Sequence, residues 1–262
     1  MMSKKWMSLF LGVVLILAAG CGGDKKADST TTGSGAKKVL TVGTSPDFSP
    51  FEFIDDKGQM AGFDIDLIHA IGKQMNAEIK MQNLSWDGLI PALQAGNIDV
   101  VIAGIAITPE RQQVALFSKP YYNTGLAILV KKGGPAITSE QDLKGKRIAV
   151  QIGTVGAERA HKIEGATVSE FNVSADTFLA LKNNNVDAVI NHLPVMKYYL
   201  KTTGEKNFEV AGPMLNSMPD GIAVKKDNQA LMDQINKALD ELKANGEYDK
   251  IYEKWFGEKP PK

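Results

Sequence analysis

Cysteine and histidine are scarce in this chain of 262 residues, which holds one cysteine and three histidines. The single thiol, Cys21, cannot form a disulfide within the chain. His69, His161 and His192 are too far apart to show the spacing of a metal-ligand motif. No Gly-rich Walker loop and no Gly-x-Ser-x-Gly elbow occurs either. We therefore expect no metal ion or other cofactor.

An excess of charge is also absent, because Lys plus Arg and Asp plus Glu number 30 each. This balance gives no electrostatic argument for nucleic acid as a partner. Long apolar runs are confined to the N-terminus, where Trp6–Leu17 is too short for a comfortable membrane span. Since no later stretch is apolar enough to cross a bilayer, we expect the working part of the chain to be soluble.

The N-terminus has the pattern of a processing segment. Two lysines precede the apolar run, and Leu17–Cys21 matches the lipobox of bacterial lipoproteins. We interpret residues 1–20 as a lipoprotein signal peptide, with an ordinary secretory signal as the alternative. Cleavage would leave Cys21 N-terminal and lipid-modified, for example by palmitate, followed by a flexible tether over 21–38. The mature protein is expected at the extracytoplasmic face of the cell membrane, in the periplasm or at the cell exterior.

Beyond the tether, predicted strands and helices alternate. Val39–Val42 and Ile79–Gln82 have the pattern of strands. Between them Asp64 is expected to cap a helix, and Ser85 is expected to cap the helix that leads to a third strand at Val100. Such alternation is typical of the α/β class and predicts a parallel sheet with right-handed crossovers.

The chain repeats this unit. Ile90–Ile102 and Phe178–Ile190 share six of 13 residues at a spacing of 88, and helix, turn and strand coincide in the two segments. We predict two α/β lobes joined by two crossovers, a hinge geometry that places a ligand cleft between the lobes. The predicted ranges are 39–121 plus 221–262 for the first lobe, 126–215 for the second, and about 121–125 and 216–220 for the crossovers.

One predicted strand ends in a candidate anion site. The apolar run from Val100 gives way to a loop at Gly104, and Thr108 followed by proline is a helix N-cap. Arg111 lies in the first turn of that helix, where a cation opposes the helix dipole. We interpret it as a fork for a carboxylate, with a solvated surface arginine as the alternative. In the repeat, His192 takes the place of Gly104, just past a strand's carboxyl end, where open α/β sheets bind ligands.

The second lobe offers a similar feature. Arg147–Gln151 has the pattern of a strand, and Gly153–Gly156 opens the helix that follows, which is a second candidate anion-binding helix start. Near the C-terminus, Ile222–Val224 is predicted to return to the first lobe as a strand. Gln229–Lys243 is amphipathic, and Tyr248–Trp255 is predicted as the last helix.

Seven motifs cover essentially everything after the tether: GTSPDFSPFEF (Gly43–Phe53), GFDIDL (Gly62–Leu67), WDGLIPALQAGNIDVVIAG (Trp86–Gly104), ITPER (Ile107–Arg111), DLKGKRIAVQIGT (Asp142–Thr154), VDAVIN (Val186–Asn191) and YDKIYEKWFG (Tyr248–Gly257). In type and order they resemble the family 3 solute-binding proteins of bacterial ABC importers. The resemblance implies a periplasmic-binding-protein type II fold, with two lobes that close on one ligand. It also implies a monomeric binding protein, not an enzyme, that delivers an amino acid or related small carboxylate to an ABC permease.

The resemblance assigns roles to matching positions of this chain. It implies that Arg111 pairs with the ligand's α-carboxylate, aided by backbone near Gly104 and at Thr154. It further implies that Phe48 and Trp86 sandwich the ligand's side chain, an arrangement that aromatic rings favour.

Other positions extend or depart from the family pattern. Asp47 is expected to meet a ligand cation, and Gln151 is expected at the side-chain end of the cleft. Ala106 replaces a Thr or Ser whose hydroxyl helps to hold the carboxylate, and Val155 replaces a small or hydroxyl residue. The resemblance therefore implies that the expected carboxylate site lacks the hydroxyl group at Ala106.

His192 is the most important departure, because the family generally has there the Asp that pairs with the ligand's α-ammonium. A neutral imidazole can accept one hydrogen bond but cannot replace the carboxylate's charge. Either the ligand is not an ordinary α-amino acid, or another acid such as Asp47 supplies the charge, or binding is weakened. A protonated His192 could instead meet a second carboxylate on an acidic or keto-acid ligand.

Two other functions stay open at this point. One is an enzyme that resembles periplasmic cyclohexadienyl dehydratases, with His192 or Glu158 as acid or base. The other is a ligand-sensing subunit that docks on a receptor.

Overall fold

The computed structural model describes residues 37–261, which form one compact unit. The predicted signal peptide over 1–20, the predicted lipidation site Cys21 and nearly all of the predicted tether over 21–38 lie outside the described residues. The first strand begins at Lys38, which the sequence placed at the end of the tether. Within the described part, no helix is long and apolar enough to cross a membrane.

The first lobe is built on a five-stranded sheet in the order β5-β1-β6-β15-β7. Parallel pairing joins β1 to β5 and β6, whereas β15 runs antiparallel to both β6 and β7. The expected parallel sheet is therefore correct only for its first three strands, because the chain returns from the second lobe as β15 in the opposite direction. The strands are β1 (Lys38–Thr44), β5 (Ala77–Asn83), β6 (Val100–Val101), β7 (Ala115–Phe117) and β15 (Ala223–Lys225).

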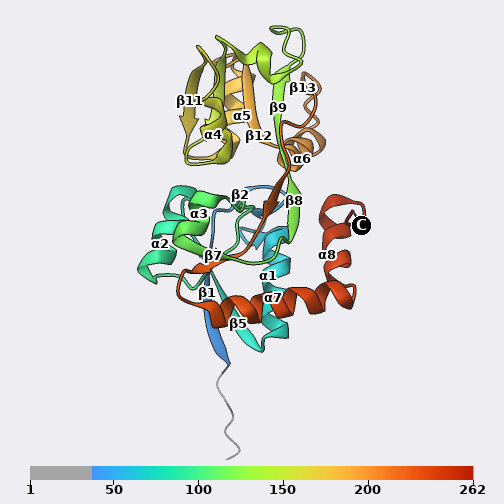
Figure 1. Cartoon of the computed structure of the whole chain (residues 1–262). Helices are drawn as coiled ribbons and strands as arrows, with labels where there is room; N and C mark the ends of the chain where they lie inside the picture. Colours follow the sequence, from blue (N-terminus) through green and yellow to red (C-terminus); the bar gives the residue numbers. More distant parts are fainter. Residues whose placement is uncertain (1–36, 262) are drawn as a thin grey trace, which may run out of the picture. The chain divides into compact units, whose positions relative to one another are not determined.

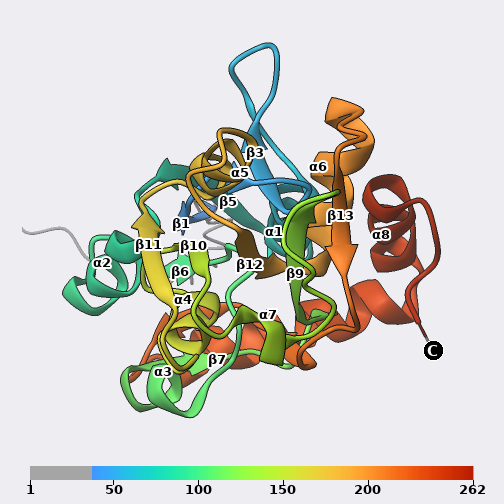
Figure 2. The same ribbon diagram turned by 90° about the horizontal axis from the view of Figure 1, so that it is seen from above.

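The second lobe is built on a sheet in the order β11-β10-β12-β9-β13 (Figure 1). Here β10 pairs in parallel with β11 and β12, and β9 runs antiparallel to β12 and β13. Figure 2 shows α4 and α5 on opposite sides of this sheet. The strands are β9 (Leu126–Lys131), β10 (Arg147–Gln151), β11 (Thr167–Phe171), β12 (Ala188–His192) and β13 (Phe208–Ala211).

Helices cover both sheets. In the first lobe they are α1 (Phe63–Gln74), the 3-10 turn η1 (Trp86–Gly88), α2 (Leu89–Ala95), α3 (Pro109–Val114), α7 (Gln229–Ala244) and α8 (Glu247–Phe256). In the second they are η2 (Glu140–Leu143), α4 (Val155–Ala160), α5 (Ser174–Lys182) and α6 (Leu193–Thr203). The predicted apolar stripe of α7 is buried, which attaches this helix to the first lobe's core.

The expected N-cap of α1 is wrong. The helix begins at Phe63 with Gly62 at the N-cap, and Asp64 lies inside the first turn. Asp64 shares the buried stripe of α1 with Leu67, Ile68 and Ile71, so its carboxyl group points into the protein. A capping side chain would have remained at the helix end, bonded to free N–H groups.

A short two-stranded ladder connects the lobes. It pairs β8 (Tyr122–Thr124) with β14 (Met218–Asp220), antiparallel, with Tyr122 opposite Asp220. We call this pair the hinge ladder. Its strands fall inside the predicted crossovers at 121–125 and 216–220. A separate three-stranded sheet, β2 (Asp47–Phe48), β3 (Glu52–Ile54) and β4 (Met60–Ala61), belongs to the first lobe.

The internal repeat is confirmed by matching hydrogen bonds. The Asp99 N–H donates to the carbonyl of Thr41, whose own N–H donates to Asp99 Oδ2, each over 2.8 Å. In the second lobe Asp187 makes the same pair of bonds with Arg147, over 2.8 and 2.9 Å. Because both aspartates bridge the start of one strand to its neighbour, the 88-residue spacing reflects one structural unit used twice.

Candidate ligand-binding site

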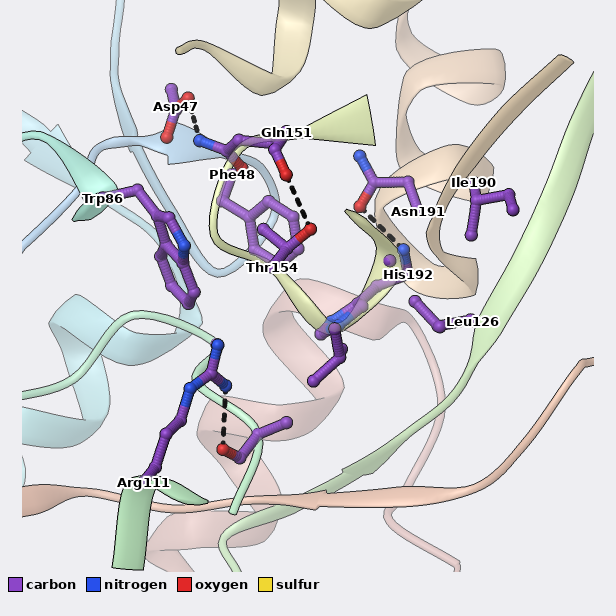
Figure 3. Close-up of a pocket in the computed structure, with 14 residues that line it drawn as sticks. Asp47, Phe48, Trp86, Arg111, Leu126, Gln151, Thr154, Ile190, Asn191 and His192 are labelled. Carbon is purple, nitrogen blue, oxygen red and sulfur yellow. Dashed lines mark hydrogen bonds between the residues drawn. The ribbon is translucent and has the colours of Figure 1, made fainter. Parts of the chain in front are cut away.

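A pocket of about 450 Å³ lies between the two lobes (Figure 3). All ten residues proposed from the sequence line it, so the structure brings them together from both halves of the chain. Four further residues were missed. The full lining is Asp47, Phe48, Trp86, Gly104, Ala106, Arg111, Leu126, Gln151, Thr154, Val155, Gly156, Ile190, Asn191 and His192.

Arg111 is placed by the local signals that the sequence carries. Thr108 accepts a hydrogen bond from the Arg111 N–H over 3.3 Å as N-cap of α3, and Pro109 is the first helical residue. The guanidinium donates to the carbonyls of Ala106, over 3.0 Å, and Gly153, over 3.3 Å. It also lies over the Trp86 ring, 5.4 Å from the centroid. Among the described residues, no carboxylate forms an ion pair with it.

The positive charge of Arg111 persists in this setting. Burial lowers the pKa of Arg111, and nearby acids such as Glu158 and Asp220 oppose that change. A guanidinium remains protonated at any physiological pH. A half-buried cation bonded only to main-chain carbonyls is suited to receive an anion from the pocket.

Phe48 and Gly104 depend on each other. Gly104 has a φ of 53°, in the left-handed region, and a Cβ added there would lie 2.9 Å from Phe48 Cε1. Only glycine fits this turn without strain and displacement of the ring. The Phe48 ring therefore lies directly on the loop that precedes Arg111.

Trp86 of the first lobe is hydrogen-bonded to the second lobe. Its Nε1–H donates to the carbonyl of Gly153 over 3.2 Å, the same carbonyl that Arg111 reaches. Trp86 and Phe48 both line the pocket, as the expected aromatic sandwich requires. Contact with a ligand remains a prediction for both rings.

Asp47 bonds to the second lobe. Its Oδ2 accepts hydrogen bonds from the Ser174 N–H, over 2.8 Å, and from Gln151 Nε2, over 3.1 Å, while Oδ1 accepts from Ser45 Oγ over 3.1 Å. Burial raises the pKa of Asp47 despite these bonds. Because Ser174 begins α5, the carboxylate also lies at the positive end of a helix dipole. The structure therefore gives Asp47 partners within the protein, where the sequence suggested a ligand cation.

The second lobe contributes uncharged polar groups. Thr154 is the N-cap of α4: it accepts from the Ala157 N–H over 3.2 Å and donates to the carbonyl of Gln151 over 2.7 Å. Both hydrogen bonds of the Thr154 hydroxyl are therefore made to backbone groups at and just before the start of its own helix. Gln151 donates to Asp47 and, over 3.1 Å, to the carbonyl of Asn172.

His192 is the last residue of β12 and is only 6% exposed. Its ring meets Phe48 edge-on, with centroids 5.1 Å apart, and no group within 37–261 bonds to its buried Nδ1. Burial, with a smaller contribution from the Arg111 charge, lowers the pKa of His192 to about 3. The imidazole is therefore neutral at physiological pH. Glu158, the other candidate acid or base, lines a different pocket, so the two do not form an acid–base pair in this one.

A group of buried acids lies behind the pocket and was not predicted. Asp64 Oδ2 accepts hydrogen bonds from the Gly104 N–H, over 2.7 Å, and from the Tyr121 hydroxyl, over 2.8 Å. Burial raises the pKa of Asp64 to about 6. The carboxyl groups of Glu52 and Asp220 are fully buried and have no hydrogen-bond partner in the described part of the chain. Burial together with neighbouring acids raises the pKa of each well above its usual value.

Sequence signals existed for some of the missed residues. The spacing of Asp64 from Leu67, Ile68 and Ile71 places it on the apolar face of α1, which indicates a buried acid. Ile190 and Asn191 end the repeated strand, and Gly156 belongs to the glycine turn already identified. Leu126 gives no comparable signal, since it is one apolar residue at the start of an apolar strand.

Comparison with known proteins agrees with this geometry. Residues 40–258 match the family described as bacterial extracellular solute-binding proteins, family 3. A probable histidine-binding protein of Neisseria gonorrhoeae is 34% identical over 257 residues, which is 97% of this chain and 96% of that protein. The type II architecture is shared with the solved structure of an ancestral arginine-binding protein bound to arginine, at 45% identity and a TM-score of 0.82, covering 84% of this chain and 99% of that one.

An ancestral amino acid-binding protein, described as a precursor of cyclohexadienyl dehydratase, is also similar. It is 39% identical with a TM-score of 0.78, over 83% of this chain and 95% of that one. Like the other two proteins, it is named for binding and not for catalysis. The motifs, the two-lobed fold and the match over nearly all of the described residues lead to one conclusion: this chain belongs to the bacterial extracellular solute-binding proteins, family 3.

Proposed function

We propose that this protein is a lipid-anchored, extracytoplasmic binding protein that captures an amino acid or related small carboxylate and delivers it to an ABC permease. Arg111 carries the proposal. It presents a permanent positive charge to an interlobe pocket, held by two carbonyls and an aromatic face, with no ion-pair partner among the described residues. A ligand carboxylate would complete its coordination through a bidentate pair.

Capture would proceed by closure of the lobes. The pocket draws Phe48, Trp86 and Arg111 from the first lobe and Thr154 and His192 from the second. A ligand that contacts both walls has more interactions when the lobes are together, so it favours the closed state by its differential affinity. The hinge ladder is the connection about which we propose that the lobes of a monomer rotate.

The remaining parts of the proposal have separate support. Relatives named for histidine and arginine binding favour an amino acid as the ligand. The lipobox that ends at Cys21 favours attachment through a lipid, with residues 21–38 as the tether. Delivery to a permease follows from the role of the ABC transporter proteins to which the chain is similar.

The test is a ligand screen of the full chain in a mild detergent, with the standard amino acids beside keto and dicarboxylic acids. Millimolar ligand at a micromolar site stabilises the folded state by about 4 kcal/mol, which thermal unfolding detects readily. Arg111→Ala should weaken binding of the identified ligand by about 30- to 3,000-fold in calorimetry, since it removes one partner of a buried charge pair.

Arg147→Ala is the matched control, because this arginine is on β10, pairs with Asp187 and does not line the pocket. It should leave affinity unchanged. Equal affinity of wild type and Arg111→Ala would refute the assignment of Arg111, and a screen in which no carboxylate binds would refute the proposed function.

A further inference from the structure

His192 differs from every other polar side chain on the pocket wall. Each of the others already has a hydrogen-bond partner in the protein, whereas the His192 imidazole forms no hydrogen bond with any group of residues 37–261. The ring is also more than nine-tenths buried. The partnered side chains are Asp47, Trp86, Arg111, Gln151, Thr154 and Asn191.

An unpartnered buried polar group is costly, so a ligand that supplies its partner gains affinity. The side chains around His192 explain why its imidazole has no hydrogen-bond partner among the described residues. Asn191, its neighbour, uses Oδ1 to accept the His192 N–H over 2.7 Å and Nδ2 to donate to Ser174 Oγ over 2.7 Å. Phe48 fills the space on the other side of the ring. The imidazole is thus held in place by packing and is free for hydrogen bonding.

The chemistry of this group is that of a neutral side chain that can accept a hydrogen bond as well as donate one. A neutral imidazole has one nitrogen that accepts and one that donates, and it carries no charge. Protonation is disfavoured because the ring is buried and the Arg111 cation is close enough to oppose it. Among the described residues that line the pocket, Asp47 alone carries a carboxylate, and it already accepts three hydrogen bonds, two of them from the second lobe.

These observations concern the substituent on the ligand's α-carbon, the carbon that carries the carboxylate. A ligand whose carboxylate pairs with Arg111 has its α-carbon next to that pair, inside the pocket that His192 also lines from the second lobe. An α-hydroxyl can donate one hydrogen bond to an imidazole nitrogen at little cost. An α-ammonium can donate the same bond, but it finds no carboxylate there to offset the loss of its hydration.

We propose that His192 determines the specificity for the α-substituent, so that the pocket binds 2-hydroxy acids as well as the 2-amino acids of the same side chain. The inference rests on the proposed function, since it deepens the account of the same site. It extends the substrate class from amino acids to small carboxylates that carry an uncharged hydrogen-bond donor on the α-carbon.

The experiment is calorimetry of the full chain with matched pairs of ligands: arginine and its 2-hydroxy analogue, histidine and imidazolelactate, glutamate and 2-hydroxyglutarate, phenylalanine and phenyllactate. For the pair that binds best, the two dissociation constants should lie within about tenfold of each other in the wild type. His192→Asp should shift their ratio toward the amino acid by about 30-fold or more, because a carboxylate forms an ion pair with the ammonium but only a hydrogen bond with the neutral hydroxyl.

His192→Gln is the matched control, since an amide is also a neutral acceptor, and the ratio should stay within about threefold of wild type. His192→Leu should weaken both ligands about tenfold through loss of the acceptor. A role in packing alone would predict equal ratios in all four proteins.

Three results would overturn the inference while leaving the proposed function intact. They are an amino acid that binds wild type 100-fold more tightly than its hydroxy analogue, a ratio unchanged in His192→Asp, or equal affinities in the Leu and Gln variants. If His192→Asp does not fold by circular dichroism, the comparison of Gln with Leu decides. If wild type binds no ligand of any pair and no carboxylate in the screen, the proposed function fails first.

Discussion

The two lobes share one structural unit but treat their carboxylates in opposite ways. Asp99 and Asp187 occupy equivalent places and make the same backbone bonds. In the first lobe and the hinge ladder, however, Glu52, Asp64 and Asp220 are buried and form no ion pair with any described residue, and burial raises their pKa values. In the second lobe Asp187 pairs with Arg147, whose hydrogen bonds lower the pKa of Asp187. A common fold unit therefore does not fix where charge is placed.

This difference accompanies a division of roles in the pocket. The first lobe supplies the cation Arg111 and the aromatic rings of Phe48 and Trp86. The second supplies uncharged polar groups, among them Thr154 and His192. We infer that a ligand's charge is recognised by the first lobe and its hydrogen-bonding pattern by the second.

The largest effect on stability is expected at Asp220, the buried acid at the end of β14 in the hinge ladder. Asp220→Asn should raise the free energy of unfolding at pH 8 by about 3 kcal/mol, since it removes a fully buried carboxyl group for which residues 37–261 supply no hydrogen-bond partner. Because the folded-state pKa is raised, the carboxyl contributes no penalty below its unfolded pKa of 3.8 and destabilises the protein as pH rises. Urea denaturation at pH 8 and pH 4 measures both values.

Asp56→Asn, at an exposed loop position, is the control and should change stability little at either pH. A gain for Asp220→Asn that is as large at pH 4 as at pH 8 would contradict the assignment of the effect to ionisation.

Smaller effects on stability are expected at Asp99 and Asp187, which occupy equivalent places in the two lobes. Asp187→Ala should cost about 2 kcal/mol and Asp99→Ala about 1 kcal/mol, because Asp187 also binds Arg147 Nε and Nη2. The half-exposed arginine reduces the advantage of that pair through solvent screening. Equal losses in urea denaturation would show that the backbone bond alone matters at both positions.

The pH dependence of Asp187 has the opposite sign to that of Asp220. Its folded-state pKa lies below the usual value, so its contribution is present above an unfolded pKa of 3.8 and is lost as pH falls through the folded-state value. The difference between wild type and Asp187→Ala should therefore shrink when denaturation is repeated at pH 3.

The smallest effect is expected on ligand affinity, at Asp47, which bonds directly to the second lobe. Asp47→Ala should weaken binding of the identified ligand about tenfold, because the closed state loses its bonds to Ser174 and Gln151. Ser45→Ala removes only the bond from within the first lobe and should change affinity less than threefold. Calorimetry that gives equal values for these two variants would show that Asp47 does not help to hold the lobes together.

Sequence patterns predicted the site better than the sheets around it. The N-cap at Thr108, the glycine at 104 and the repeated strand end at His192 are local signals. Thr108 starts the helix that carries Arg111, and the structure places Arg111, Gly104 and His192 on one pocket. Ala106 and Val155 line the same pocket, so the departures from the family pattern concern residues at the site. Contact of these residues with a ligand stays a prediction.

What the sequence did not predict depends on contacts between distant segments. The antiparallel strands β9 and β15 follow from how the chain enters and leaves the hinge ladder, which no periodicity records. Asp220 is buried because β14 pairs with β8, nearly 100 residues earlier in the chain. Asp47 lies in a polar turn, and its bonds to Gln151 and Ser174 arise only when the second lobe meets it.

The hinge ladder has a consequence for how this protein can evolve. In the proposed cycle, the measured dissociation constant is the intrinsic one divided by the fraction of molecules whose lobes can close. Substitutions in β8 or β14 that shift this fraction would therefore raise or lower affinity for every ligand by the same factor. Affinity and specificity then become separately adjustable: affinity at a two-stranded connection outside the pocket lining, and specificity at the pocket wall.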